Sequence, residues 1–481
     1  MPGLEIVSVR SLNQGILDFD DLSHIDFGVT ALGSITATQH LGYTLHLGGK
    51  KADVFKGLLE DLRRGDRLQD FINLDTKIGL APGDGIRQAS QDQTIDEGIE
   101  GRIHSHPTGN AGLSSGGVIV LTSRDEPPKV ELIPTPQAGS GSAVIRVLNA
   151  GVLSYAGKVY NGTRPYTFPT PLVPGFGAIA RVASVGPDAT LLKCGQLVYF
   201  DATIYGRDDP HAIFLSGLHD GYTEGSKKLM NDEWRDGTYA EYAKVPLEGC
   251  TVLDEKRLLW SVDEDGLGYQ LEDLVIIARL LVPYGGLRDI HLKPGETVII
   301  APATGPFGGA AVHVALAMGA RVIAMGRNLS VLESLAAHSE RVFIVQITGD
   351  TAADTASLRA FGAADVYFDI SPPQAAKSTH IKSAIMALRH EGRISLMGGI
   401  REDIAIPHSV VMHGNLVIKG TWMYPREAIG EMLKMIEVGV LRLGESIGQR
   451  LVGTFGLEEW SEAFKAAAEN TAAGDLVLIT P

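Results

Sequence analysis

The spacing of apolar residues changes along this chain, and the change predicts two kinds of architecture. Between residues 295 and 397, short apolar and β-branched runs alternate with stretches in which apolar residues recur every three or four positions. Such runs are typical of buried strands in a parallel sheet, and such stretches are typical of helices. This alternation predicts a doubly wound α/β sheet. We expect its strands at 297–301, 321–325, 342–346, 366–370 and 393–397, and its helices at 310–318, 331–337, 353–361 and 381–390.

The segments on either side of this sheet follow other patterns. From 116 to 251 the chain consists of strand-like runs with Pro and Gly turns, which predicts an irregular β-barrel. A helical run at 271–281, followed by an expected turn at 283–286, leads from the barrel to the sheet. Amphipathic spacing after the sheet predicts two helices and a final strand, at 426–438, 457–469 and 475–479.

Residues 1–113 are less regular. Short strands are expected between 25 and 47, and charged residues among apolar ones predict a helix at 52–74. We interpret this part as an α+β extension of unknown role.

The stretch from Gly295 to Asn328 carries the clearest chemistry. A buried strand is followed by a glycine-rich turn, a helix of small residues and a second strand. The turn reads A-T-G-P-F-G-G, with Gly305, Gly308 and Gly309 in place of the common G-x-G-x-x-G spacing. Glycines let a backbone approach a pyrophosphate, and a helix N-terminus offers free N–H groups to it. The stretch therefore predicts a dinucleotide site.

Composition sets limits on the rest. The 481 residues are enough for about three domains, and 44% hydrophobic and 21% charged residues are typical of globular proteins. A net charge of −15 argues against nucleic acid or an anionic membrane as a partner. The two cysteines exclude a disulfide scaffold, and we find neither a signal peptide nor a membrane span. We expect a cytoplasmic protein.

Four further segments strengthen the picture, and together they resemble the medium-chain dehydrogenase/reductase family over about 116–481. They are PGFGAIARVASVG, KCGQLV, GTYAEYAKVP and LKPGETVIIAPATGPFGGAAVHVALAMGA, at 174–186, 193–198, 237–246 and 292–320. The sequences of these segments are most similar to a zinc-independent, quinone-oxidoreductase-like branch of the family. The resemblance implies an α/β protein with a GroES-like β-barrel domain at 114–278 and a Rossmann domain at 279–430. A return segment at 431–481 would pack on the barrel.

Several departures from the family pattern bear on whether the chain binds zinc. Where zinc alcohol dehydrogenases of the family carry a cysteine and two histidines, this chain has Leu153, Ser154 and Phe176. Residues 202–234 are read as a long polar lobe between two strand-like runs. They stand where other members hold four cysteines for a structural zinc, and this segment contains none. We expect no zinc. Without a Lewis acid, reduction of an activated C=C bond is favoured over alcohol oxidation.

A second zinc-like motif lies in the extension. His104-x-His106, with Ser114 after it, resembles the core of JAMM-type zinc isopeptidases. That family has an aspartate ligand where this chain has Gly117, and a site without it is one ligand short. We interpret the motif as a coincidence or a relic.

The end of the second strand of the dinucleotide unit selects the cofactor. An acidic residue there would hold the ribose of NAD, but the chain has Gly326, Arg327 and Asn328. A guanidinium binds phosphate, so NADP(H) is expected. The full set of expected cofactor residues is Thr304, Gly305, Pro306, Phe307, Gly308, Gly309, Gly326, Arg327, Asn328, Gly398 and Gly399.

The candidate catalytic residues are hydroxyl donors. Tyr155 and Ser154 lie beside the vacated zinc positions, and Tyr284 lies in the expected turn before the cofactor strand. A solvent proton is an alternative to all three, and a packed structural role is an alternative for Tyr155.

The sequence thus predicts an NADPH-dependent reductase of a small-molecule enone, quinone, enoyl thioester or carbonyl. Two alternatives stay open: an enoyl reductase that partners a synthase, and a non-catalytic nucleotide-binding relative. A homodimer is expected from the resemblance alone.

Overall fold

The computed structural model describes residues 26–29, 34–39, 43–48 and 115–481, which belong to two compact units, Met1–Thr108 and Gly109–Pro481. In the first unit, three strands form an antiparallel sheet in the order β1-β2-β3. They are β1 (Asp26–Val29), β2 (Ser34–Gln39) and β3 (Tyr43–Gly48), where short strands were expected. The helix expected at 52–74 lies outside the described residues.

The second unit contains a six-stranded parallel sheet in the order β15-β14-β13-β16-β17-β18. The strand order reverses between β13 and β16, and ligands of such sheets bind beyond the carboxyl ends of the strands at that point. The strands are β13 (Thr297–Ala301), β14 (Arg321–Gly326), β15 (Val342–Gln346), β16 (Ala364–Asp369), β17 (Leu388–Leu396) and β18 (Val417–Gly420). The predicted doubly wound Rossmann sheet is confirmed.

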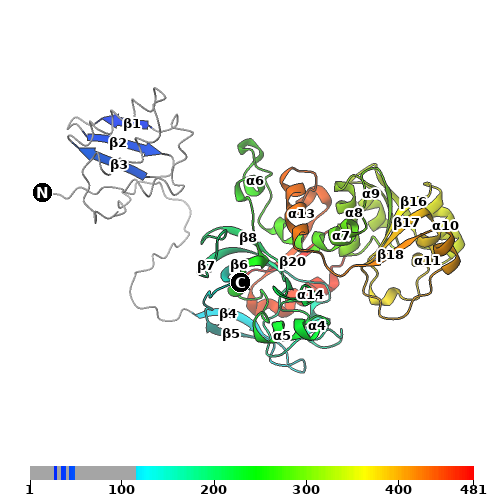
Figure 1. Ribbon diagram of the computed structural model, residues 1–481, viewed down its shortest axis with the longest axis horizontal. Helices are drawn as coiled ribbons and strands as arrows, with labels where there is room; N and C mark the ends of the chain where they lie inside the picture. Colours follow the sequence, from blue (N-terminus) through cyan, green and yellow to red (C-terminus); the bar gives the residue numbers. More distant parts are fainter. Residues whose placement is uncertain (1–25, 30–33, 40–42, 49–114) are drawn as a thin grey trace. The chain divides into compact units, whose positions relative to one another are not determined.

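Alternate residues of these strands face opposite layers of helices. Ile300 packs in one core cluster with residues of α8 (Pro306–Ala317) and α9 (Leu329–Ala336). Its neighbour Ile299 packs in another with residues of α10 (Thr351–Arg359) and α11 (His380–Met386). The two layers lie on either side of the sheet in Figure 1. This arrangement follows from the two-residue period of a strand buried on both faces.

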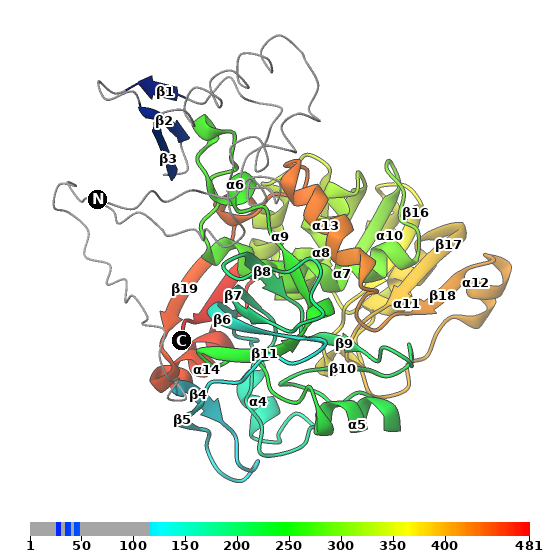
Figure 2. The same ribbon diagram turned by 60° about the vertical axis from the view of Figure 1, so that its left-hand side comes forward.

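A seven-stranded sheet forms the barrel part of the second unit. Its path runs β12-β8-β7-β6-β20-β19, and β11 also pairs with β6. The strands are β6 (Ser142–Gly151), β7 (Ala178–Val185), β8 (Leu197–Phe200), β11 (Tyr242–Pro246), β12 (Cys250–Val252), β19 (Arg450–Phe455) and β20 (Asp475–Ile479). The last strand of the chain thus returns to β6, where Leu478 is paired with Gly151 (Figure 2).

The remaining elements surround these two sheets. Strands β4 and β5 form a hairpin, and β9 and β10 form a second two-stranded sheet. They and the other helices are β4 (Ser115–Val120), β5 (Lys129–Pro134), β9 (Thr203–Tyr205), β10 (Ile213–Leu215), α4 (Ala156–Tyr160), α5 (Glu224–Asp232), α6 (Glu255–Leu259), α7 (Ile277–Asp289), α12 (His408–His413), α13 (Glu427–Glu437) and α14 (Trp460–Glu469). Among the described residues, no helix has the length and apolarity that a membrane crossing requires.

The turn expected at 283–286 is wrong, because these residues lie inside α7. A Cβ on Gly285 would lie 2.5 Å from the carbonyl oxygen of Met423, and one on Gly286 would lie 2.8 Å from the Phe368 ring. These glycines therefore let the helix pack closely on the sheet. The boundary that we drew between 278 and 279 also falls inside this helix.

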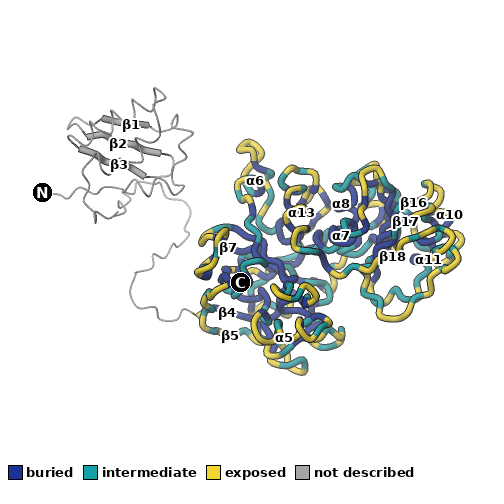
Figure 3. Tube along the Cα trace, viewed as in Figure 1, coloured by how far each residue is buried: buried dark blue, intermediate teal, exposed yellow. Residues whose placement is uncertain are grey.

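Two further expectations differ from the structure. The helix expected at 381–390 ends at Met386, because the chain pairs with β16 from Leu388 onward. The segment 202–234, which we read as a polar lobe, contains β9, β10 and α5 and contributes the buried Phe214 and Met230 to the core. Figure 3 colours the chain by burial and shows the buried residues gathered in the interior of the second unit.

Candidate functional site

The glycine turn after β13 forms an open helix N-terminus. Helix α8 begins at Pro306, and Gly305 is its N-cap, without a side chain to cap the helix. The first N–H groups of a helix have no partner within it, and the helix dipole places partial positive charge there. A Cβ on Gly305 would meet no atom within 4 Å, so the space beside the N-cap residue is open. The turn therefore fits a pyrophosphate.

The other two glycines of the turn serve packing. A Cβ on Gly308 would collide with the carbonyl oxygen of Pro302, and one on Gly309 would collide with the Cβ of Ala473. Gly308 thus lets α8 approach β13, and Gly309 lets the segment before β20 lie against the helix. Thr304 and Phe307 complete the turn, and both are half-buried.

The end of β14 lies beside this turn in the sheet. A Cβ on Gly326 would lie 2.5 Å from Cγ2 of Thr304, so the side chain of Thr304 fills the space beside this glycine. Asn328 is the N-cap of α9, where its Oδ1 accepts from the N–H of Val331 at 3.3 Å. The exposed side chain of Arg327 is the one basic group of the three expected residues.

Gly398 and Gly399 follow β17, at the same edge of the sheet. A Cβ on Gly398 would lie 2.6 Å from Oδ2 of Asp369, and the N–H of Gly399 donates to the carbonyl oxygen of Ser371 at 2.7 Å. This edge is held by a buried network that the sequence did not indicate. Ser371 Oγ donates to Asp369 Oδ1 at 2.6 Å and lies 2.8 Å from Nε2 of His380.

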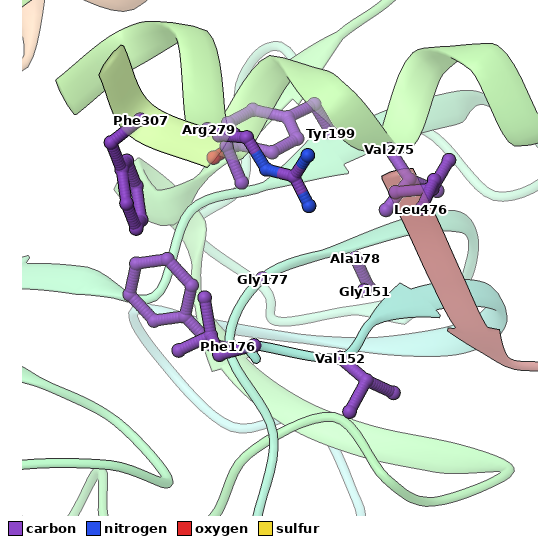
Figure 4. Close-up of a pocket in the computed structure, with 12 residues that line it drawn as sticks. Gly151, Val152, Phe176, Gly177, Ala178, Tyr199, Val275, Arg279, Phe307 and Leu476 are labelled. Atoms are coloured by element: carbon purple, nitrogen blue, oxygen red, sulfur yellow. The ribbon is translucent and has the colours of Figure 1, made fainter. Parts of the chain in front are cut away.

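A cavity lies between the barrel and the glycine turn (Figure 4). Leu153 and Phe176, which stand at the family's zinc positions, line it together with Phe307 of the turn. Helix α7 and the short 3₁₀ helix before it contribute Val275, Ala278 and Arg279. The other lining residues are Gly151, Val152, Gly177, Ala178, Tyr199 and Leu476.

The donor set of this cavity does not fit zinc. The side chains of Leu153 and Phe176 contain only carbon and hydrogen, and zinc requires nitrogen, sulfur or oxygen ligands. Across the described ranges, no group of three or more His, Cys, Asp or Glu side chains is arranged to hold a metal ion. His104, His106 and Ser114 of the other zinc-like motif lie outside these ranges, and Gly117 lies in β4.

Tyr155 is the N-cap residue of α4 and is half-buried. The guanidinium carbon of Arg164 lies 3.9 Å from the centre of its ring, and the ring centres of Tyr155 and Tyr166 are 6.2 Å apart. Burial raises the pKa of Tyr155 well above its usual value, the nearby Tyr166 adds to the rise, and the charge of Arg164 opposes it. Tyr155 is therefore a neutral hydroxyl. Ser154, also half-buried, precedes it.

Tyr284 lies elsewhere. It is buried on α7 rather than in a turn. None of the three candidates Tyr155, Ser154 and Tyr284 is among the residues that line the cavity. The hydroxyl of Tyr284 donates to Oε2 of Glu431 at 2.9 Å, and the same carboxylate accepts from Nε of Arg288 at 2.6 Å. Burial and the bond to Glu431 raise the pKa of Tyr284 to about 12. The hydroxyl of Tyr284 on α7 is thus hydrogen-bonded to Glu431 on α13.

Residues that the sequence did not single out join the barrel to the Rossmann sheet. Arg401 Nη2 donates to the carbonyl oxygen of Pro165 at 3.1 Å. Arg164 Nη2 donates to the hydroxyl of Tyr166 at 3.0 Å and would lie 3.6 Å from a Cβ on Gly399. The Nε of Arg164 is buried without a hydrogen-bond partner. The contacts of Arg401 with Pro165 and of Arg164 with Gly399 join segments that lie far apart in the sequence. No spacing signal marks them for this reason.

An aromatic cluster adjoins the hydrogen bond between Arg164 and Tyr166. The rings of Tyr166 and Tyr222 lie 4.8 and 5.1 Å from that of His219, and Trp422 lies 5.2 Å from Tyr222. His219 Nδ1 accepts from the N–H of Gly221 at 2.9 Å, which leaves the ring proton on Nε2. Burial lowers the pKa of His219, so the ring is neutral at pH 7.

The comparisons with known proteins agree with this geometry. A model of the alcohol dehydrogenase GroES-like domain matches residues 139–255, and a zinc-binding dehydrogenase model matches residues 306–438. Together the two matches cover just over half of the chain. They lie on the seven-stranded sheet and on the Rossmann sheet.

Three similar proteins illustrate the match. The chain is 25% identical over 346 residues to L-threonine 3-dehydrogenase of Streptomyces coelicolor, covering 70% of this chain and 91% of the relative. It is 25% identical over 329 residues to an alcohol dehydrogenase of Geobacillus stearothermophilus, covering 67% and 89%. A solved alcohol dehydrogenase from E. coli CFT073, in complex with NADH, matches with a TM-score of 0.62 and 16% identity, covering 76% of this chain and 100% of that one.

The fold, the glycine turn and these matches define the class of protein. The chain belongs to the medium-chain dehydrogenase/reductase family, whose members combine a GroES-like domain with a Rossmann domain. It is an oxidoreductase of this family.

Proposed function

We propose that this chain is an NADPH-dependent, zinc-independent reductase that transfers a hydride to an activated C=C bond or a carbonyl of a small molecule. One observation carries the proposal. The open N-terminus of α8 and a cavity with hydrocarbon side chains at the zinc positions meet at Phe307, which belongs to both. A nicotinamide dinucleotide bound at this turn supplies the hydride.

The residues of the chain have three tasks in this proposal: they bind the cofactor, exclude water and stabilise the charge that develops on the substrate. The N–H groups at the start of α8 bind the pyrophosphate, and Arg327 binds the ribose phosphate that distinguishes NADPH from NADH. Leu153, Phe176 and Phe307 exclude water from the reacting carbon.

The third task is to stabilise the negative charge that develops on the substrate oxygen. Without zinc, hydrogen-bond donors must do this. Tyr155 is the leading candidate, because its hydroxyl is neutral and the cation of Arg164 lies against its ring. Ser154 and a solvent proton are the alternatives. Tyr284, bonded to Glu431, is the weakest of the three candidates.

The test is a turnover panel. Purified protein is mixed with NADPH and a set of enones, quinones, enoyl thioesters, aldehydes and alcohols, and nicotinamide absorbance is followed. We expect reduction of at least one activated double bond or carbonyl. Tight NADPH binding without turnover on any substrate would instead favour a nucleotide-binding role. Turnover confined to thioesters on a carrier protein would favour a partner of a synthase.

Matched tyrosine variants complete the panel. We expect Tyr155→Phe to lower kcat about 10²-fold or more if its hydroxyl is the acid, and Tyr284→Phe to leave kcat within a few-fold. Equal turnover of Tyr155→Phe and the wild type would exclude Tyr155 as the acid and leave Ser154 or solvent as the proton source. A homodimer and a cytoplasmic location complete the proposal, and light scattering of the purified protein tests the first.

A further inference from the structure

The cavity beside the glycine turn contains a charge that the proposed chemistry does not use. Of the residues that line it, Arg279 is the one with a charged side chain. Its neighbours in the cavity wall are mostly hydrocarbon, among them Val275, Leu476 and Phe176. Figure 4 shows the guanidinium of Arg279 pointing from α7 into the space between these side chains.

This guanidinium has no ion-pair partner among the described residues. Its Nη1 donates to the carbonyl oxygen of Asp475 at 2.8 Å. The carboxylate of Asp475 is engaged by Arg450, whose Nε donates to Oδ1 at 2.9 Å. In the described part of the chain, no carboxylate lies within ion-pair distance of Arg279, whereas Arg181, Arg288 and others have such partners. Burial lowers the pKa of Arg279 to about 10, and the charge of Asp475 opposes the fall, so the guanidinium stays charged at pH 7.

A charge in apolar surroundings is costly unless an opposite charge and hydrogen bonds compensate it. A guanidinium has five N–H donors in a planar fork, and this fork matches the two oxygens of a carboxylate. The backbone carbonyl oxygen of Asp475 accepts from one of these five N–H donors. The remaining donors fit an anion that enters the cavity from outside the protein.

We propose that Arg279 is a specificity residue that binds a carboxylate of the substrate, so that the cavity takes small apolar molecules with one acidic group. This inference rests on the proposed reductase function, because it assigns the substrate class of the same site. The cavity wall selects for an apolar body, and Arg279 selects for the acid.

The position of Arg279 favours the substrate over the cofactor as the source of the anion. The dinucleotide phosphates are expected at the start of α8 and at Arg327. Arg279 instead lies on α7 and bonds to the barrel strand β20 through Asp475. It shares the cavity with Leu153 and Phe176, beside which the substrate of the proposed reaction would lie.

The first test measures binding without turnover. Cinnamate and cinnamamide are titrated by calorimetry into the full-length protein saturated with NADP⁺, which has no hydride to transfer. The two ligands have the same shape and differ in charge. We expect the wild type to bind cinnamate about 10- to 100-fold more tightly, as for a hydrogen-bonded ion pair. We expect Arg279→Gln to bind both equally and Arg279→Lys to keep part of the preference.

The second test measures turnover with (E)-4-oxopent-2-enoate and its methyl ester. We expect a KM about 10- to 100-fold lower for the acid in the wild type, and equal KM values in Arg279→Gln with little change for the ester. Arg146→Gln, at an exposed position of β6, is the matched control and should behave as the wild type. Thermal unfolding of each variant checks that the fold is intact.

The outcomes separate the two proposals. Equal wild-type affinity for acid and amide, or an unchanged preference in Arg279→Gln, would overturn the carboxylate site while leaving the reductase in place. Loss of NADPH affinity in Arg279→Gln would assign the guanidinium to the cofactor and would also overturn it. Preference for cinnamate without turnover on any substrate would support the carboxylate site and contradict the reductase. If Arg279→Gln does not fold, Arg279→Lys with an unchanged cinnamate preference and affinity would overturn the site, and a reduced preference would support it.

Discussion

A cation lies against the side chain that is the leading candidate for proton donation. The guanidinium carbon of Arg164 lies 3.9 Å from the centre of the Tyr155 ring. Cations near a developing oxyanion stabilise it without a metal. The replacement of zinc ligands by Leu153 and Phe176 is therefore accompanied by fixed positive charge in the same region.

Arg327 should decide between the two nicotinamide cofactors. The space beside Gly326 is filled by Thr304, so the preference for NADPH depends on the exposed guanidinium. We expect Arg327→Ala to lower kcat/KM for NADPH about 10- to 100-fold and to leave NADH almost unchanged. Arg321→Ala, at the opposite end of β14, is the control. Equal use of both cofactors by the wild type would contradict this assignment.

Asp201 should make stability depend on pH. Its carboxylate is buried and accepts from the hydroxyl of Tyr424 at 2.8 Å and the N–H of Thr203 at 3.1 Å. Burial raises its pKa from 3.8 to about 6, and these hydrogen bonds oppose the rise. The folded state thus binds a proton more tightly than the unfolded state. This contribution is complete below pH 3.8 and is lost as the pH rises through about 6.

The measurement compares unfolding free energies of the wild type and Asp201→Asn between pH 4 and 7. We expect the wild type to lose about 3 kcal/mol relative to the variant over this range. The control Asp263→Asn, at an exposed position, should show no such trend. Parallel curves for wild type and Asp201→Asn would show that this carboxyl titrates normally.

At the scale of elements, the sequence predicts strands well where burial alone determines them. The expected strands at 297–301, 342–346 and 475–479 agree with β13, β15 and β20 residue for residue. Each is a short apolar run between polar or Gly-containing segments, and no other structure buries it as well. Helix α8 begins four residues before its expected start, because the turn residues Pro306–Gly309 already belong to its first turn.

The errors have a common physical origin in tertiary packing. Gly285 and Gly286 look like turn residues, but they occur in α7 where the helix touches Met423 and Phe368. The pattern of apolar and polar residues within one segment contains no information about contacts with distant segments. For the same reason the sequence did not reveal the contacts of Arg164 or Arg279.

The two glycines at the start of α8 should respond differently to a methyl group. Gly308→Ala places a Cβ against the carbonyl oxygen of Pro302, so we expect a loss of about 1–3 kcal/mol in stability. Gly305→Ala meets open space, and we expect its stability to change by less than about 0.5 kcal/mol while NADPH affinity falls at least 10-fold. Thermal unfolding and NADPH titration measure both. Undiminished NADPH binding by Gly305→Ala would remove the pyrophosphate from this turn.

At the scale of the whole molecule, the end of the chain joins the two sheets of the second unit. The segment before β20 contacts Gly309 through Ala473, and β20 itself pairs with β6 of the barrel. Arg279 also bonds to this strand. The cofactor turn, the cavity and the barrel are thus connected by residues that lie far apart in the sequence.

The second unit should therefore work without residues 1–108. It contains both matched family segments and its own core clusters. We expect residues 109–481, expressed alone, to bind NADPH and to turn over substrate as the full chain does, within about two-fold. Insoluble or inactive protein from this shorter chain would show that the first unit supports the fold or the site.

The central claim is hydride transfer without zinc, and one measurement tests it most directly. The protein is freed of metal by a chelator and given NADPH deuterated at the transferring position of the nicotinamide, together with the substrate that the panel identifies. We predict deuterium on the product carbon at the same rate with and without the chelator, because the side chains of Leu153 and Phe176 offer no donor atom to zinc. A rate that the chelator abolishes and zinc restores would contradict this account.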